Sequence, residues 1–398
     1  MRVGVAEIME TGHITLAETI CMIFSCDPGN QVFLFTLDRH TSNLAFLSDT
    51  CPNLVISAKP SGKKMEEFLN DMEAYALDRI YLVTLSKHFR IISKWQLKTR
   101  LFLIVHNIDE WFGISLVESV KKFLYSVSGT LQGKLWIYFF KVNFIFPSYK
   151  RKILEKVQKS DGRLVVLSRS LQNKLNNLNI NIASEVIPFS VFNPSLATVN
   201  PPLNKQLRIC VPGILSQYRR NYLALFDLLE TQLAEYKPLF VLDLLGGVQN
   251  ENQFDNPALL LERIDSLKKN GFSIIVHNVQ FIPPVEYDLE LSKADIIVGN
   301  MNVALNKFSS YGKTKETGIP FAMIRAAKPG ILPEAYPFPD EISTSTLVYQ
   351  DIKNLGEILA DLISDRKKIE DLKRKALENS KKFSPESIYN RILDKQHL

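Results

Sequence analysis

The segment NKFSSYGKTKETGIPFAMIRAAKPGILP, residues 306–333, decides the fold that we expect for this chain. Its first half is polar and broken by glycines, whereas residues 319–327 are apolar nearly all round and predict a short buried helix. Pro320 suits the first helical turn, and Lys328-Pro329 ends the helix in front of a short buried strand, GILP. A polar loop, a buried helix and a buried strand in this order indicate an α/β protein.

The polar half of this segment suits a phosphate or diphosphate. Hydroxyls, lysines and backbone N–H groups would gather at the N-terminus of the helix, which carries a partial positive charge. The residues expected to take part are Tyr311, Gly312, Lys313, Thr314, Lys315, Thr317 and Gly318. An ordinary solvated loop in front of an ordinary helix explains the same residues equally well, so the segment alone leaves both interpretations open.

Length and composition point to a globular protein of two domains. At 398 residues the chain is too long for one small core, and 46% apolar with 23% charged residues is ordinary for a folded protein. Four cysteines are scattered without a CxxC pair, so neither a zinc site nor a disulfide framework is indicated, and a reducing cytoplasm fits. The first residues lack the features of a signal peptide, and no apolar run reaches the roughly 18 residues of a membrane span.

The net charge of +6 lies entirely in the first half of the chain. Residues 1–192 hold 23 Lys and Arg against 17 Asp and Glu, a difference of six, whereas residues 193–398 hold 25 of each. The excess is concentrated in residues 87–174, which hold 17 basic and 5 acidic residues. We therefore expect an anionic partner for the first half. Since no nucleic-acid motif accompanies the charge, we favour a membrane surface and expect no nucleic-acid partner.

Short apolar strands alternate with helices along both halves of the chain. In the first half, strands are predicted at residues 2–8, 31–36, 54–57, 80–84, 101–106, 163–168 and 185–188, with helices at 14–24, 64–78, 86–98 and 171–175. Residues 193–206, rich in Pro, Asn and Ser, are predicted to be a linker. Beyond it, strands are predicted at 207–211, 239–244, 273–276, 295–298, 330–333 and 346–349, with helices at 222–236, 256–270, 284–293 and within 352–383.

This alternation implies parallel sheets wrapped by helices. We therefore predict an α/β protein with two doubly wound, Rossmann-like domains, residues 1–192 and 207–398, that face each other across a cleft. A C-terminal helix is expected to pack back. Ligands of such sheets bind at the carboxyl ends of the strands, which is where we expect the site.

Residues 111–159 interrupt the first domain with a segment that is rich in aromatic and basic residues and has no clear strand. Its aromatic run, residues 136–146, is flanked by Lys134, Lys150, Arg151 and Lys152. Aromatic rings beside lysines suit the headgroup region of a bilayer. A long helical hairpin that packs its aromatics into the domain is the other interpretation, and both remain open.

Taken together, seven pieces in order resemble GT-B fold glycosyltransferases, in particular the family 4 type that builds bacterial polysaccharides and glycolipids. The resemblance spans nearly the whole chain. It is carried by TGH at residues 11–13, VHN at 105–107, VVLSRSLQNKL at 165–175, VIPFS at 186–190, VPGILSQYRRNY at 211–222, FIPPVEYDLELSKADIIV at 281–298 and YGKTKETGIPFAMIRAAKPGILP at 311–333.

The resemblance implies transfer of a sugar from a nucleotide sugar to an acceptor. The second domain would hold the nucleotide diphosphate and the first the acceptor. Arg219 and Arg220 match positions that contact the diphosphate, and Gly213 would let the chain pass close to the donor. Phe281 and Ile282 lie where the family holds the base, and Glu286 would reach a ribose or only cap its helix. Cations and backbone N–H groups would stabilise the leaving diphosphate, so no metal or other cofactor is expected.

The chain departs from the family at one place. The usual pair of glutamates, separated by seven intervening residues, is absent, and Thr314 and Ala322 stand at the matching positions, with Glu316 displaced by two residues from the first. This departure puts in doubt the usual contacts to the donor sugar and ribose. It also puts in doubt any borrowed stereochemical outcome, and it leaves a non-catalytic relative as an alternative.

Candidates for the catalytic base come from the first domain. His13 lies at the start of a helix, where a histidine with a pKa near neutrality would take a proton from an acceptor hydroxyl. The alternative is a residue at the helix start that only forms a hydrogen bond within the turn. His106 ends a buried strand and would face the donor sugar, while Asp109 or Glu110 behind it would be another base; a satisfied strand-end histidine is the alternative. His277 ends a strand of the second domain and is expected to be structural.

The sequence thus favours a metal-independent glycosyltransferase that acts at the cytoplasmic face of a membrane on a lipid-linked or glycan acceptor, in the assembly of cell-surface polysaccharide or glycolipid. A GT-B protein without activity that serves as a binding subunit is the alternative from another class. A sugar-nucleotide epimerase is a third possibility, although it would leave residues 111–159 without a purpose. A periplasmic binding protein is disfavoured by the missing signal peptide.

Overall fold

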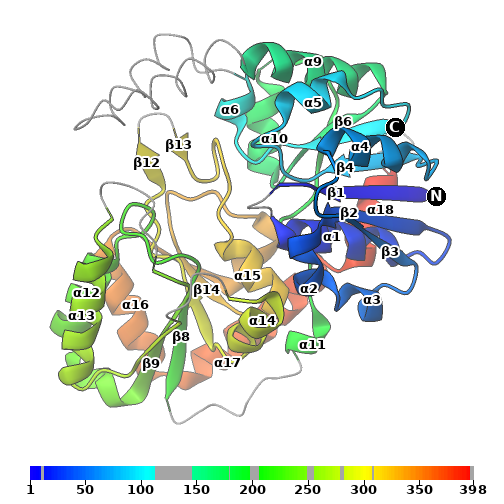
Figure 1. The fold of residues 1–398 in the computed structure, drawn as a ribbon. Helices are drawn as coiled ribbons and strands as arrows, with labels where there is room; N and C mark the ends of the chain where they lie inside the picture. The colour runs from blue at the N-terminus through cyan, green and yellow to red at the C-terminus, as the bar shows by residue number, and fades with distance from the viewer. Residues whose placement is uncertain are drawn as a thin grey trace, which may run out of the picture. The chain divides into compact units, whose positions relative to one another are not determined.

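The computed structural model describes residues 1–9, 13–112, 146–178, 180–197, 206–248, 255–277, 282–306 and 309–394. Its contacts divide the chain into two compact units, whose elements are labelled in Figure 1. The first unit comprises Met1–Phe189, Lys313–Glu316 and Tyr389–Leu398, and the second comprises Ser190–Gly312 and Thr317–Ile388. Four residues of the segment at 306–333 thus belong to the first unit, a placement that the sequence pattern does not anticipate.

The first unit is built on a seven-stranded sheet with the order β3-β2-β1-β4-β5-β6-β7. All neighbouring strands are parallel. The strands are β1 (Arg2–Glu7), β2 (Gln31–Leu37), β3 (Leu54–Lys59), β4 (Arg79–Leu82), β5 (Arg100–Ile104), β6 (Arg163–Val166) and β7 (Ser184–Val186). Every strand predicted for this half of the chain is present. Strands β4, β5 and β6 end about two residues before the predicted limits, because apolar runs continue into the buried chain that leaves the sheet.

Helices cover both faces of this sheet. They are α1 (Ile14–Ser25), α2 (Thr41–Leu44), α3 (Leu47–Thr50), α4 (Met65–Glu73), α5 (Phe89–Lys94), α6 (Ile108–Phe112), α9 (Phe146–Lys159) and α10 (Arg169–Asn176). Side chains of α4, α5, α9 and α10 form one core with the strands. The predicted helix at 86–98 is wrong at both ends, since His88 has a left-handed backbone (φ +61°) directly before α5.

The second unit is built on a six-stranded parallel sheet with the order β10-β9-β8-β11-β14-β15. Its strands are β8 (Leu207–Pro212), β9 (Phe240–Leu245), β10 (Ile274–Val276), β11 (Ile296–Val298), β14 (Gly330–Pro333) and β15 (Thr346–Tyr349). Its helices are α11 (Pro194–Ala197), α12 (Tyr222–Thr231), α13 (Pro257–Lys269), α14 (Pro284–Ser292), α15 (Ile319–Ala326), α16 (Ile352–Ser364) and α17 (Arg366–Lys381). The buried helix and strand predicted from residues 319–333 are confirmed as α15 and β14.

Two local features differ from the prediction, and the helical region predicted within 352–383 is divided into two helices. A small antiparallel hairpin, β12 (Ala304–Asn306) with β13 (Ser309–Ser310), precedes the polar loop. The helix predicted at 222–236 ends at Thr231, and residues 234–239 form a 3₁₀ helix that contains Pro238, which cannot continue an α-helix. Helices α16 and α17 are separate because Asp365 ends one and caps the other, accepting a hydrogen bond from the Lys367 N–H (3.1 Å).

The last helix, α18 (Pro385–Asp394), reaches the first unit through its second half. The Tyr389 hydroxyl donates to an Asp27 carboxylate oxygen (2.8 Å) and accepts from the Asn30 amide (3.1 Å). The predicted return of the C-terminal helix is therefore present within this unit. No helix in the described ranges is long and apolar enough to span a bilayer. Most of the segment at 111–159 lies outside the described residues, apart from the ends that form α6 and α9.

Candidate functional site

The carboxyl ends of β1, β4 and β5 bring together polar residues of the first unit. Glu7 ends β1 and is fully buried. Its carboxylate accepts hydrogen bonds from the backbone N–H of Met9 (3.1 Å) and of His13 (3.0 Å) and from the Thr84 hydroxyl (2.7 Å). Burial raises the pKa of Glu7, and the three donors oppose that rise. Glu7 therefore fixes the backbone of His13 directly before α1.

The two candidate histidines of this unit lie against each other. The ring centroids of His13 and His106 are 4.2 Å apart, with His13 exposed and His106 half-buried. His106 Nε2 lies 3.0 Å from the Val83 carbonyl oxygen. This bond requires the proton on Nε2, which leaves Nδ1 as an acceptor. Burial, and then the neighbouring His13, lower the pKa of His106 to about 3. His106 is thus a neutral, oriented imidazole at physiological pH, and His13 is the more accessible of the two candidate bases.

We predict that the imidazole of His106 stays neutral as the pH is lowered from 8 to 5. The desolvated ring and its like-charged neighbour disfavour the imidazolium, so its folded-state pKa lies below the usual value of about 6.5. The contribution of His106 to the free energy of unfolding is fully present above pH 6.5. It falls as the pH drops towards 3, because the unfolded chain then binds a proton that the folded chain does not bind. Carbon-13 NMR titration of the histidine Cε1–H signals measures the pKa of His106. The signals are assigned with His13→Asn and His106→Asn variants. A His106 midpoint near 6.5 would contradict the prediction.

Part of the predicted phosphate loop packs on the end of β5 in the first unit. The Ile108 N–H donates to the Thr314 carbonyl oxygen (2.9 Å), and Asn107 forms an antiparallel bridge with Lys315. The Ser168 hydroxyl, which caps α10, donates to a Glu316 carboxylate oxygen (2.5 Å). Glu316, the displaced glutamate of the sequence comparison, is therefore committed to Ser168. Asp109 lies in the first turn of α6, half-buried, directly after this bridge.

In the second unit, the loop that follows β8 carries the predicted glycine and arginines. Gly213 has φ +100°, a conformation that L side chains rarely adopt, and a Cβ there would lie 2.6 Å from Arg220 Nη2. Arg220 is only 8% exposed, and its Nη1 donates to the Pro212 carbonyl oxygen at the end of β8. Arg219 is half-buried beside it. The glycine thus lets the guanidinium of Arg220 lie against the backbone at the end of the strand.

Asp255 holds this loop in place and was not singled out from the sequence. Its two carboxylate oxygens lie 2.9 and 3.0 Å from the Ser216 hydroxyl, and one accepts from the Tyr218 N–H (3.0 Å). The Ser216 hydroxyl lies in turn 3.3 Å from the Arg219 N–H, which donates to it. In the sequence, Asp255 precedes Asn256 and Pro257 and looks like one more residue at a helix start, so nothing signals its long-range role.

We predict that Asp255→Ala lowers the melting temperature and disorders the loop at 213–220. The substitution leaves the buried Ser216 hydroxyl and the Tyr218 N–H without their acceptor, at a cost of about 1–3 kcal/mol. Thermal unfolding and hydrogen exchange at Tyr218 measure it. Asp227→Ala on the exposed face of α12 is the matched control, with little change expected. An unchanged melting temperature for Asp255→Ala would contradict this role.

The remaining predicted donor residues lie in the chain before α15 and at the start of α14. Gly318 is its N-cap without a side-chain cap, and Pro320 stands in the first turn as expected. Tyr311 and Thr317 are buried, and Gly312 has φ +73° where a Cβ would meet Pro337 at 2.6 Å. Lys313 is exposed. Ile282 is buried and Glu286 is exposed in the first turn of α14, while Phe281 lies outside the described residues.

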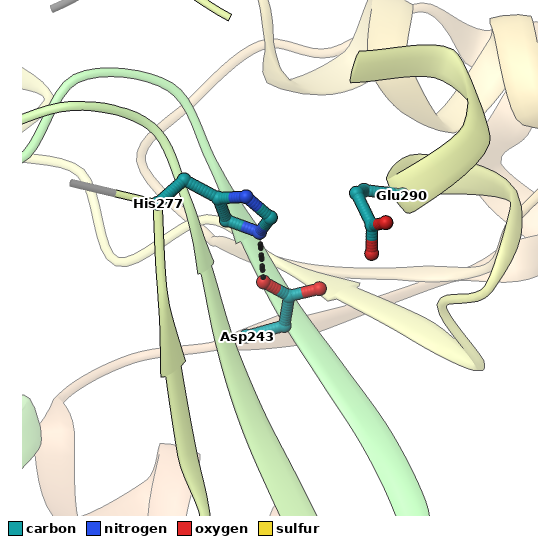
Figure 2. Close-up of side chains that lie close together, drawn as sticks. All are labelled: Asp243, His277 and Glu290. Carbon is teal, nitrogen blue, oxygen red and sulfur yellow. Dashed lines mark hydrogen bonds and ion pairs between the residues drawn. The ribbon is translucent and has the colours of Figure 1, made fainter. Parts of the chain in front are cut away.

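An ionic cluster formed by β9, the residue after β10 and α14 has the outline of a metal site. Asp243, His277 and Glu290 each offer one ligand atom, and these atoms lie within 4.8 Å of one another (Figure 2). Arg208 Nη2, however, lies 2.6 Å from Asp243 Oδ2 and 2.7 Å from Glu290 Oε2. His277 Nε2 lies 3.1 Å from the other Asp243 oxygen. The guanidinium already bonds both carboxylates, so these residues do not fit a metal. The cluster instead joins α14 and the end of β10 to β8 and β9.

Comparison with known proteins was made at the level of sequence and of structure. No protein-family model and no curated protein sequence matches the chain. Among solved structures, HepE of Anabaena in complex with UDP is similar at 14% identity and a TM-score of 0.58, over 100% of this chain and 99% of that one. A glycosyltransferase of Rickettsia africae is similar at 12% identity and 0.57, over 99% and 97%. WaaG, a glycosyltransferase involved in lipopolysaccharide biosynthesis, is similar at 11% and 0.54, over 99% of each chain.

At sequence identities this low, the similarity of structure establishes the fold alone. The chain has the GT-B fold, with two Rossmann-like units of seven and six parallel strands. The fold class predicted from the sequence is therefore confirmed. The predicted site residues fall into two groups at the carboxyl ends of the sheets: His13, His106, Asp109, Lys313, Thr314 and Lys315 in the first unit, and Gly213, Arg219, Arg220, Ile282, Glu286, Tyr311, Gly312, Thr317 and Gly318 in the second.

Proposed function

We propose that this protein is a glycosyltransferase that uses a nucleotide-diphosphate sugar as its donor. The observation that carries the proposal is the loop after β8, where Gly213 and the adjacent Arg219 and Arg220 lie at the point at which the strand order of the second sheet reverses. Nucleotides bind doubly wound sheets at such a point. Solved structures of HepE, which has the same fold, contain UDP and UDP-glucose.

The proposed chemistry uses the protein's own cations. As the bond between the sugar and the diphosphate breaks, negative charge grows on the leaving oxygen. Arg219 offers a forked set of donors to phosphate oxygens, and the N-terminus of α15 offers N–H groups without a side-chain cap. We therefore propose that the reaction needs no divalent metal. His13, exposed and held by Glu7, would accept the proton of the acceptor hydroxyl.

A panel of nucleotides tests the donor proposal. We expect one of UDP, GDP, dTDP, ADP and CMP to raise the melting temperature of the purified chain equally with and without magnesium. Arg219→Ala should weaken binding of that nucleotide about tenfold, because a charge-assisted hydrogen bond to phosphate is lost. Arg263→Ala, a surface arginine of α13 paired with Asp227, is the matched control and should leave affinity unchanged. No shift with any nucleotide would overturn the proposal.

A GT-B protein that binds a nucleotide sugar without turnover is the second candidate. It is favoured by Thr314 and Ala322, which stand where related enzymes carry glutamates, and by the commitment of Glu316 to Ser168. Release of the free nucleotide from the donor, followed over hours with and without acceptor glycans, separates the two functions. A sugar-nucleotide epimerase would instead convert the donor sugar and release no nucleotide.

For the acceptor, we propose a lipid-linked or glycan molecule of cell-surface polysaccharide or glycolipid assembly, met at the cytoplasmic face of an anionic membrane. Helix α9 supports this proposal: only Ile153 and Val157 of its residues are buried, and Arg151, Lys152 and Lys159 are exposed. Lys150 is different, because its ammonium lies 5.2 Å above the Phe89 ring and 5.5 Å above the Trp111 ring. Lys150 therefore stabilises the packing of α9, and the exposed cations are the ones available to lipid.

We predict that replacing Arg151, Lys152 and Lys159 together by Gln reduces binding to vesicles of phosphatidylglycerol and phosphatidylcholine. Each removed charge should cost about 1 kcal/mol of attraction to the anionic surface. Vesicle co-sedimentation at 0.1 M salt measures the bound fraction. A triple replacement of Lys367, Arg374 and Lys381 on α17 removes the same charge and serves as the control. Equal binding by the two triple variants would sink the membrane proposal.

A further inference from the structure

The chain that leaves β11 is bound to the arginine loop through its backbone. The Asn221 N–H donates to the Asn300 carbonyl oxygen (3.1 Å), and the Asn302 N–H donates to the Arg219 carbonyl oxygen (2.9 Å). Between them, Arg220 and Met301 form an antiparallel bridge. Strands β8 and β11 are the neighbours at which the strand order reverses. Asn300 therefore lies at the end of a central strand, directly beside the residues proposed to bind the diphosphate.

The side chain of Asn300 is buried and unsatisfied. It is 3% exposed, and within the described residues neither its amide nitrogen nor its amide oxygen has a hydrogen-bond partner. Asn302, two residues later, differs, because its side-chain amide donates to the carbonyl oxygens of Gln217 (3.3 Å) and Tyr218 (3.0 Å). Buried polar groups are almost always paired, because a group removed from water without a partner destabilises the folded state. An amide left unpaired at a ligand-binding position points to a bound partner.

The chemistry of an amide limits what that partner is. Nδ2 donates and Oδ1 accepts, so full satisfaction requires a ligand that both accepts and donates. A diphosphate at neutral pH only accepts, and it would leave Oδ1 unpaired. A pair of neighbouring sugar hydroxyls meets both needs, since each hydroxyl donates once and accepts twice. The chain also lacks the pair of glutamates that the family resemblance would place on the donor sugar and ribose, since Thr314 and Ala322 stand at the matching positions.

We propose that Asn300 binds a pair of hydroxyl groups on the nucleotide sugar, through a donated hydrogen bond from Nδ2 and an accepted one at Oδ1. The inference rests on the proposed function, because it takes the ligand to be a sugar nucleotide. The hydroxyls belong either to the ribose or to the transferred sugar. Asn300 is thus a residue that selects the sugar part of the donor, whereas Arg219 and Arg220 act on the diphosphate.

Calorimetric titration tests the proposed contact. Wild type and Asn300→Ala are each titrated with UDP, 2′-deoxy-UDP and UDP-glucose, and with the matching adenosine and guanosine compounds. We expect Asn300→Ala to weaken one class of ligand about tenfold, the effect of losing hydrogen bonds made only in the complex. A loss seen with UDP but absent with 2′-deoxy-UDP assigns the contact to the ribose. A loss seen only with UDP-glucose assigns it to the transferred sugar.

Stability of the free protein provides the second readout. Asn300→Ala and the apolar Asn300→Val, which avoids a cavity, should keep the melting temperature within about 2 °C of wild type, because no protein hydrogen bond is lost. Asn302→Ala should lower it clearly, since two bonds disappear. A fall for both Asn300 variants as large as that of Asn302→Ala, or a failure of both to fold, would mean that the amide is bonded inside the protein and would overturn the inference.

The failures of the two proposals are distinguishable. If wild type binds a nucleotide sugar and both Asn300 variants bind it equally well, the inference about Asn300 is overturned while the donor proposal stands. If wild type binds none of these compounds and neither dTDP nor CMP, both are overturned. Preserved stability together with a selective loss of affinity is the result that supports a hydroxyl contact.

Discussion

The antiparallel pairing of residues 219–221 with 300–302 is the constraint on which the candidate site of the second unit depends. Parallel strands end in chain segments that leave the sheet in different directions, and these two segments instead turn back on each other through the bonds of Asn221 and Asn302. The pairing fixes where α12 begins, because Asn221 also caps that helix through its side chain (3.3 Å to the Ala224 N–H). Asp255 anchors the other end of the loop. Arg219 and Arg220 are therefore positioned by backbone bonds, and Arg220 also by the bond from its guanidinium to the Pro212 carbonyl oxygen.

Much of the fold follows from short-range sequence features. Buried parallel strands read as continuous apolar runs, so β8 and β11 were predictable from LRICVP and DIIV, and Pro320 with Lys328-Pro329 marked the limits of α15 closely. What the sequence could not supply are contacts between distant residues. Glu7 binds the N–H of His13 and the hydroxyl of Thr84, 77 residues away, and Ser168 binds Glu316, 148 residues away. No local pattern distinguishes these groups from ordinary caps and solvated charges.

The buried charges show how this protein separates structural from functional ions. Arg208 and Lys293 together balance the charges of Asp243 and Glu290. Burial alone would raise the pKa of Glu290, but bonds from Lys293 and Arg208 lower it. Lys373 and Asp295 form a second buried pair at 2.6 Å, again away from the end of β8. Ions paired in this way have little left to offer a ligand. Groups at the carboxyl ends of the strands differ: the side-chain amide of Asn300 has no hydrogen-bond partner among the described residues, and His106 is neutral.

The distribution of charge supports different partners for the two halves of the chain. The second half has no net charge, yet a diphosphate can still be held there, because the relevant field is local and comes from two adjacent arginines and one helix N-terminus. The excess of six in the first half is not concentrated around Glu7, His13 and His106. Part of it lies along α9, where exposed cations surround only two buried residues. A charge excess that serves neither the core nor the histidine pair is best explained by an extended anionic surface, which is the physical reason for proposing a membrane-bound acceptor.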